Sequence, residues 1–142
     1  MRLKLIIAAA AVGVEVCLKV QAMDRWAALS QLETRDNDNV VGAAGEISRF
    51  QIKPKLWQRY AGSDANWKNP VEALAAAQQL MKERCAGFQR THTRPPTDFE
   101  FYVLWNAPAQ LKQPCKVVRE RAERFTRLVT REDGDAKVEP RR

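Results

Sequence analysis

The chain has 142 residues, of which 45% are hydrophobic and 29% charged, and four are tryptophan. This size and composition are typical of one folded domain with a hydrophobic core. The formal net charge of +7 favours polyanionic partners, but no run of Lys or Arg is long enough for a nucleic-acid arm. We therefore expect no nucleic-acid partner.

Residues 1–22 have the pattern of a signal peptide. Arg2 and Lys4 give a positive start, residues 5–14 are small or apolar, and residues 20–22 end in a small-residue cleavage pattern. We expect a secreted or periplasmic protein without a stable membrane span, because a spanning helix needs about 20 apolar residues. An uncleaved amphipathic N-terminal helix is the alternative.

Residues 23–129 are expected to form a mainly α-helical single domain, and residues 130–142 a disordered tail. The first helix spans about 24–35, and a short β element at most is expected near residues 46–52. Pro54 begins the next helix, and Asn69 caps a longer one that we expect to end at Gly87. Later helices are expected from the capping box of Thr97 and Glu100 until Pro108 stops the first of them, and from Pro114 to about 129.

Apolar spacing predicts the buried faces of the last three helices. In the helix after Asn69 we expect the core to be faced by Val71, Leu74, Ala75, Gln78, Met81 and Cys85. In the next helix the predicted face consists of Phe99, Tyr102, Val103 and Asn106. In the last helix it consists of Val118, Ala122, Phe125 and Val129, whereas the charged run 119–124 is expected to be a solvated face.

The cysteines and the single histidine give no metal-binding pattern. Cleavage after residue 22 would remove Cys17 and leave Cys85 and Cys115 in an oxidising compartment, either as one disulfide or as two free thiols. His92 lies in a polar stretch that we expect to be an exposed loop, and the cysteines are far apart. We therefore expect no metal site.

Glu33 is the first candidate for chemistry. In a helix it lies on the same face as Trp26, Leu29 and Ser30, at the i, i+3, i+4, i+7 spacing. Burial disfavours the charged form of a carboxylic acid, and an acid that stays protonated near neutral pH can serve as a general acid. An exposed glutamate in a last helical turn is the alternative.

Three short segments carry a resemblance to a known family. Residues 29–34 (LSQLET) place a glutamate at a helix end, residues 45–54 (GEISRFQIKP) place a glycine shortly before a Gln-Ile pair, and residues 102–108 (YVLWNAP) form an aromatic-Asn-Ala run. In order and spacing they resemble segments of the lysozyme-like lytic transglycosylases, the catalytic-domain family of the soluble lytic transglycosylase. That family has a fold similar to goose-type lysozyme.

The segments also depart from the family pattern. Thr34 stands where the family has Ser, and this change keeps a hydroxyl group. Pro108 stands where the family has Gly. Trp105 stands where the family commonly has Tyr, so a hydroxyl near the catalytic acid is either missing or supplied by Tyr102. Glu46 adds a second acid close to the Gln-Ile pair.

The resemblance implies an enzyme that cleaves the MurNAc-GlcNAc β-1,4 bond of peptidoglycan glycan strands without a cofactor. Glu33 would act first as acid and then as base on the muramyl C6 hydroxyl, which gives a 1,6-anhydro end. A hydrolytic lysozyme would use Glu46 as the second carboxylate to hold a water. A salt bridge of Glu46 with Arg49 or Arg35 is an equally weighted alternative.

The remaining candidates are substrate-binding residues. The amides of Gln51 and Asn106 suit the orientation of an N-acetyl group and sugar hydroxyls. Tyr102 and Trp105 offer flat faces for sugar rings, although aromatic residues at helical spacing more often pack in a core. A noncatalytic glycan-binding or structural cell-envelope protein of the same fold is a further alternative.

Overall fold

The structure is a computed structural model that describes residues 22–130. The predicted signal peptide up to residue 21 and the predicted tail from residue 131 lie outside the described residues. The helices are α1 (Arg25–Thr34), α2 (Pro54–Tyr60), α3 (Pro70–His92), α4 (Asp98–Asn106) and α5 (Lys116–Thr130), with a 3-10 turn at Pro108–Gln110. Within the described range, the β pairing is an isolated antiparallel bridge of Ile47 with Ile52. The prediction of a mainly α-helical single domain is confirmed.

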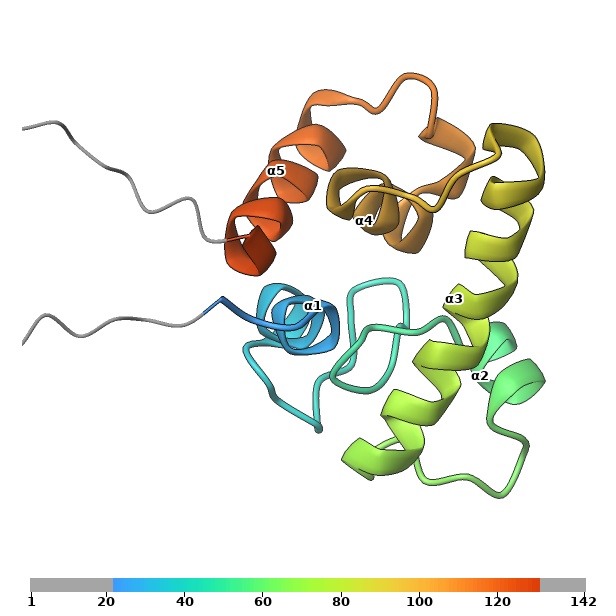
Figure 1. Ribbon diagram of the computed structural model, residues 1–142. Helices are drawn as coiled ribbons and strands as arrows, with labels where there is room; N and C mark the ends of the chain where they lie inside the picture. The colour runs from blue at the N-terminus through green and yellow to red at the C-terminus, as the bar shows by residue number, and fades with distance from the viewer. Residues whose placement is uncertain (1–21, 131–142) are drawn as a thin grey trace, which may run out of the picture.

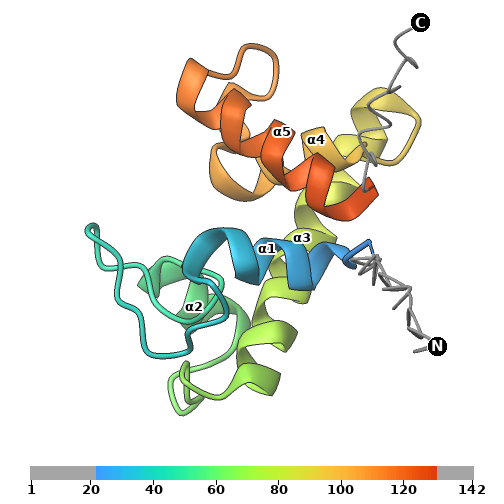
Figure 2. The ribbon, with the colours of Figure 1, turned by 90° about the vertical axis from the view of Figure 1, so that its left-hand side faces the viewer.

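The helices form two neighbouring groups joined by α3. α4 and α5 pack against each other at one end of the molecule, and α2 packs on α3 at the other (Figure 1). α1 lies next to α5, as the second view also shows (Figure 2). No helix of the described part is long and apolar enough to cross a lipid bilayer.

The starts of α3 and α4 follow the predicted capping signals, and α1 has a side-chain cap as well. The Asp24 carboxylate accepts hydrogen bonds from the backbone N–H groups of Trp26 and Ala27, at 2.8 and 3.1 Å. Asn69 caps α3 in the same way, and α1 ends where Arg35 adopts a left-handed conformation with φ of 56°. Side-chain caps satisfy the first N–H groups of a helix locally, which is why the sequence alone places these starts well.

The expected end of α3 at Gly87 is wrong, and so is the loop around His92. α3 continues to His92, and Thr93 ends it in a left-handed conformation with φ of 56°. Glycine inside a helix costs about 1 kcal/mol. The next residue offsets that cost, because Phe88 is 4% exposed and its ring stacks on the His92 ring at 3.9 Å.

The predicted buried face of α3 is right only in part: Met81 is buried and Leu74 and Cys85 pack partly buried against the core, but Val71, Ala75 and Gln78 are exposed. Val71 is 73% exposed, whereas the residues in the core are Ala73, Ala76, Ala77, Leu80, Met81 and Phe88. The three alanines on this face are small, so neighbouring segments can pack closely on the helix backbone. Hydrophobicity alone favoured the larger Val71 and so indicated the wrong side.

α4 is the central helix rather than a one-sided one. The five consecutive residues 101–105 are all buried, so the prediction of a single buried face is wrong for this helix. It packs on α3 and α5, and the T-shaped contact of Trp26 with Phe101 links it to α1. A helix covered on all sides is apolar all round, which removes the periodic signal on which the prediction depends.

The start of α4 is held by a capping box joined to a salt bridge. The Glu100 carboxylate accepts from the backbone N–H of Thr97 at 2.9 Å and from both terminal nitrogens of Arg94 at 2.7 Å. The Arg94 hydrogen bonds, together with those of Thr97, lower the pKa of Glu100 to about 2.

We expect Glu100→Gln to lower the free energy of unfolding by about 1–2 kcal/mol at pH 7. The pKa of this carboxyl is lower in the folded than in the unfolded protein. Its contribution is therefore complete above the ordinary pKa of 4.5 and is lost as the pH falls towards 2. Urea unfolding of both proteins at several pH values measures the difference. A difference that stays constant down to pH 2, or one equal to that of the exposed Glu123→Gln, would contradict it.

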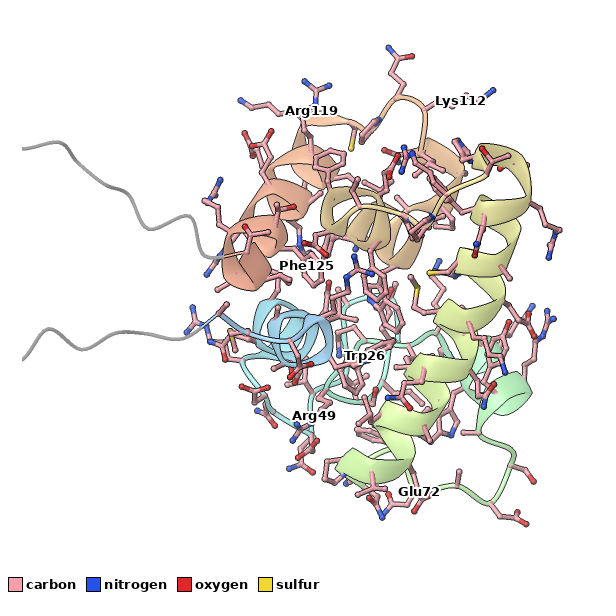
Figure 3. The ribbon with its side chains drawn as sticks, in the orientation of Figure 1. Trp26, Arg49, Glu72, Lys112, Arg119 and Phe125 are labelled. Atoms are coloured by element: carbon pink, nitrogen blue, oxygen red, sulfur yellow. The ribbon has the colours of Figure 1, made fainter. Side chains whose placement is uncertain are left out.

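α5 closes the core as predicted. Val118, Ala122 and Phe125 are buried, and Phe125 stacks on Phe101 with ring centroids 5.8 Å apart. Figure 3 shows Phe125 between the helices, whereas Arg119 and Lys112 extend into solvent at the outer edge. The helix reaches the last described residue, Thr130, which the sequence analysis assigned to the tail. α5 is therefore part of the folded domain over its whole described length.

Cys85 and Cys115 are both free thiols in the folded domain. Cys85 is half-buried on α3, and Cys115 is exposed just before α5. Of the two alternatives left open by the sequence, the structure has the two free thiols.

Candidate active site

A groove with a cavity volume of about 960 Å³ opens where the C-terminal ends of α1 and α4 come together. One wall is the loop 42–46 with the segment 51–56, and the other is made by α3, the end of α4 and α5. Five of the predicted site residues line the groove: Glu33, Glu46, Gln51, Trp105 and Asn106. Segments distant in the sequence thus bring these side chains to one place.

Glu33 lies at the inner end of this groove. It is in the last turn of α1, and its side chain is only 6% exposed. The hydroxyl of Tyr102 donates to one carboxylate oxygen at 2.9 Å, and Nη2 of Arg121 donates to the other at 2.9 Å. The prediction that Glu33 is buried is confirmed, and the alternative of an exposed helix-end glutamate is wrong.

Burial raises the pKa of Glu33 above the ordinary value of 4.5. Desolvation is the largest cause, and the negative charge of Glu46 acts in the same direction. Arg121, by its charge and hydrogen bond, and the Tyr102 hydroxyl both lower the pKa, but burial outweighs them. The surroundings of this carboxyl group therefore include groups that favour its protonated form and groups that favour its carboxylate form.

Tyr102 is buried outside the groove lining, so it does not offer the groove the flat face that we expected for a sugar ring. Its side chain is 0% exposed and does not line the groove. Instead its hydroxyl supplies the hydrogen bond to Glu33 that Trp105 cannot give, which confirms the second of the two alternatives for this hydroxyl. Burial and the adjacent Glu33 charge raise the pKa of Tyr102, so the phenol stays protonated and donates.

If Glu33 is the acid, we expect Tyr102→Phe to move the alkaline limb of the pH–rate profile to higher pH. Loss of the hydroxyl removes a hydrogen bond that favours the carboxylate, so the pKa of Glu33 rises further. The rate of turnover measured against pH gives the shift. Tyr60→Phe is the matched control, because its hydroxyl bonds the exposed Glu83 on α3. A profile that moves to lower pH, or an equal shift in the control, would contradict the assignment.

Hydrogen bonds order the chain that leaves α1 after Glu33. The buried Ser30 hydroxyl donates to Asp36 at 2.6 Å, and the Thr34 hydroxyl donates to the backbone carbonyl of Arg49 at 3.0 Å. Arg49 in turn pairs with Asp38, at 2.6 Å from Nε and 2.9 Å from Nη2. These contacts join the helix end that carries Glu33 to the segment that carries Gln51.

Glu46 is the second acid of the groove. Its alternative role, a salt bridge with Arg49 or Arg35, is wrong: Arg49 pairs with Asp38, and Glu46 forms no ion pair within the described residues. Glu46 accepts instead from the backbone N–H of Ala44 at 3.1 Å and lines the groove. The Glu46 side chain therefore remains available in the groove.

Gln51 is held against the groove wall by its backbone and by its amide. Its φ of 53° is left-handed, and its Nε2 donates to the carbonyls of Ser48 at 3.1 Å and Val40 at 3.3 Å. Gly42 lies against it so closely that a Cβ there would clash with the side chains of Gln51 and Glu46. Gly42 thus shapes this wall.

The end of α4 forms the opposite wall. Trp105 is 8% exposed and presents little surface to the groove, whereas Asn106 is exposed. Nη1 of Arg84, from α3, donates to the carbonyls of Leu104 and Trp105 at 2.6 and 2.7 Å. Arg84 satisfies carbonyls at the end of a helix, which have no partner within it. It thereby holds the Trp105–Asn106 wall in place.

Arg121 and Arg84 are the site residues that sequence reasoning missed. Arg121 belongs to the charged run of the last helix that we expect to be a solvated face, yet its side chain is 38% exposed and paired with Glu33. One signal could have indicated it. Arg121 lies three residues after Val118 and four before Phe125, so it borders the buried stripe of α5.

Among residues 22–130, no group of three or more His, Cys, Asp or Glu side chains is arranged to hold a metal ion. Comparisons with known proteins give no match, because no family model, no curated protein and no solved structure matches this chain. The function is therefore inferred from the residues of the groove.

Proposed function

We propose that this protein is a lytic transglycosylase that cleaves the MurNAc-GlcNAc β-1,4 bond of peptidoglycan, with Glu33 as the catalytic acid and base. The observation that carries the proposal is the carboxyl group of Glu33, 6% exposed at the inner end of a groove, with its pKa raised by burial. The resemblance of segments 29–34, 45–54 and 102–108 supports the same activity, because each contributes residues to this groove.

The chemistry requires two opposite properties of one side chain. Glu33 first gives a proton to the bridging oxygen as positive charge develops at the sugar ring. As a carboxylate it then takes the proton of the muramyl C6 hydroxyl, which attacks and forms the 1,6-anhydro ring, so that no water is consumed. Burial favours the protonated form, while Tyr102 and Arg121 stabilise the carboxylate that remains after proton transfer.

Hydrolysis is the second candidate, and the position of Glu46 supports it. An inverting hydrolase needs a second carboxylate that activates a water on the opposite face of the sugar. Glu46 lines the groove, and its negative charge acts on Glu33. In that mechanism Glu46→Gln would abolish turnover, whereas in the transglycosylase mechanism it would not.

Mass spectrometry of the products tests the proposal. Purified wall sacculi are incubated with the protein, and the soluble muropeptides are analysed. Products that lack one water relative to the hydrolytic product indicate the transglycosylase, and products with a reducing end indicate the lysozyme. Binding of sacculi without release of muropeptides would contradict both and indicate a noncatalytic glycan-binding protein.

A further inference from the structure

Arg121 connects the buried acid to the open groove. One of its nitrogens donates to Glu33 at 2.9 Å, yet the side chain is 38% exposed and lines the groove. Its guanidinium also lies over the Tyr102 ring, 5.9 Å from the centroid. A guanidinium has five N–H donors in a planar fork, and Glu33 accepts one of them. Arg121 is therefore held at Glu33 by a single hydrogen bond, which an acceptor in the groove can replace.

The groove carries an excess of positive charge. Its lining contains four basic residues and two acidic ones: Lys53, Lys55, Arg84 and Arg121, and Glu33 and Glu46. The two lysines are exposed, and neither forms a salt bridge within the described residues. Such a groove favours a ligand that bears negative charge over a neutral one.

We propose that Arg121 binds a carboxylate of the glycan ligand, and that it leaves Glu33 to do so, whereupon Glu33 takes up a proton from the solvent. The inference rests on the proposed function, since muramic acid is the sugar of peptidoglycan that bears a lactyl group. A carboxylate is present there either on the free lactyl group or on the stem peptide attached to it. N-acetylglucosamine has none.

The groups around Glu33 give the direction of the effect. Those that act on it are Arg121 from α5, Tyr102 from α4 and Glu46 from the loop 42–46. When Arg121 pairs with the ligand, Glu33 loses both its attraction and its hydrogen bond, whereas burial and Glu46 still oppose the charged form. The pKa of Glu33 then rises above its value in the free protein. Binding of a ligand that bears a carboxylate would thus favour the protonated form of Glu33, which is the form that acts as the acid.

The exchange can be tested with sugars that contain no glycosidic bond and are not consumed. The pKa of the Glu33 side-chain carboxyl is measured by carbon-13 NMR in the free protein and at saturation with each sugar. The three sugars are N-acetylmuramic acid, with a free lactyl carboxylate, muramyl dipeptide, with a carboxylate on the peptide, and N-acetylglucosamine, with none.

We expect the pKa of Glu33 to rise with at least one of the two acids and to stay unchanged with N-acetylglucosamine. A rise with N-acetylmuramic acid alone assigns the lactyl carboxylate, and a rise with muramyl dipeptide alone assigns the peptide carboxylate. An unchanged pKa with both acids, an equal rise with N-acetylglucosamine, or no saturable binding of either acid overturns the proposal. These results come from the wild-type protein and need no variant.

Arg121→Met gives an independent measurement. We expect it to bind the recognised acid about tenfold more weakly, because a hydrogen bond to a charged group is lost, and to show no further rise in the pKa of Glu33 on binding. Arg119→Met is the matched control, since it removes one charge from the exposed side of the same helix. Equal weakening by both variants overturns the proposal. Turnover of sacculi without any ligand-induced pKa change refutes this inference alone, whereas the absence of turnover refutes the proposed function.

Discussion

Glu33→Gln is expected to reduce the release of soluble muropeptides from wall sacculi by about 100- to 10,000-fold, the range typical of a general acid. The amide cannot give a proton to the bridging oxygen or take one from the C6 hydroxyl. Its carbonyl can still accept the hydrogen bond from Tyr102, which lies 2.9 Å from the native carboxylate. The change therefore removes the chemistry and preserves most of the packing.

Two comparisons keep this result interpretable. Glu123→Gln makes the same substitution at an exposed position on α5 and is expected to keep full turnover. Thermal unfolding followed by circular dichroism checks that the Glu33→Gln protein is folded. Equal release by the folded Glu33→Gln protein and the wild type would rule out Glu33 as the acid.

Phe125→Ala is expected to have the largest effect on stability, a loss of about 3–5 kcal/mol in the free energy of unfolding. Phe125 is 0% exposed and packs on Phe101 and Tyr102, with ring centroids 5.8 and 5.5 Å away. The substitution leaves a cavity between α4 and α5, the two helices that position Tyr102 and Arg121. Turnover should fall with stability, because both partners of Glu33 depend on this contact.

Urea unfolding measures this loss, with Val117→Ala as the control. Val117 lies on the same helix but is 64% exposed, so its truncation should change the free energy of unfolding by less than about 0.5 kcal/mol. If the two variants were equally stable, α5 would not be packed on α4 as described. The domain would then end before this helix, and Arg121 would not belong to the site.

The capping residues and the helix starts could be predicted from the sequence, because they depend on neighbours a few residues away. Asp24, Asn69 and Thr97 each hydrogen-bond a backbone N–H group within the next three residues. Helical spacing likewise placed Glu33 on the same face as Trp26, Leu29 and Ser30, but left open whether its side chain is exposed. The fold class and the first candidate residue were therefore accessible without coordinates.

The buried faces of the middle helices were less predictable. On α3 the core face is made largely of alanines, while the larger Val71 points to solvent. From size and hydrophobicity, valine is expected to be buried before alanine. On α3 the alanines are buried instead, because neighbouring segments pack closely against the helix. α4 gives no periodic signal, because it is covered on all sides.

By itself, the sequence determined that a mainly helical domain places a glutamate at a helix end. Only the tertiary structure decided which groups control that glutamate. Tyr102 and Arg121 are 69 and 88 residues away along the chain, and they reach Glu33 because α4 and α5 pack beside α1. Local hydrogen bonds can be predicted from short stretches of sequence, because donor and acceptor are only a few residues apart. A contact between distant side chains exists only after the core that joins their helices has formed.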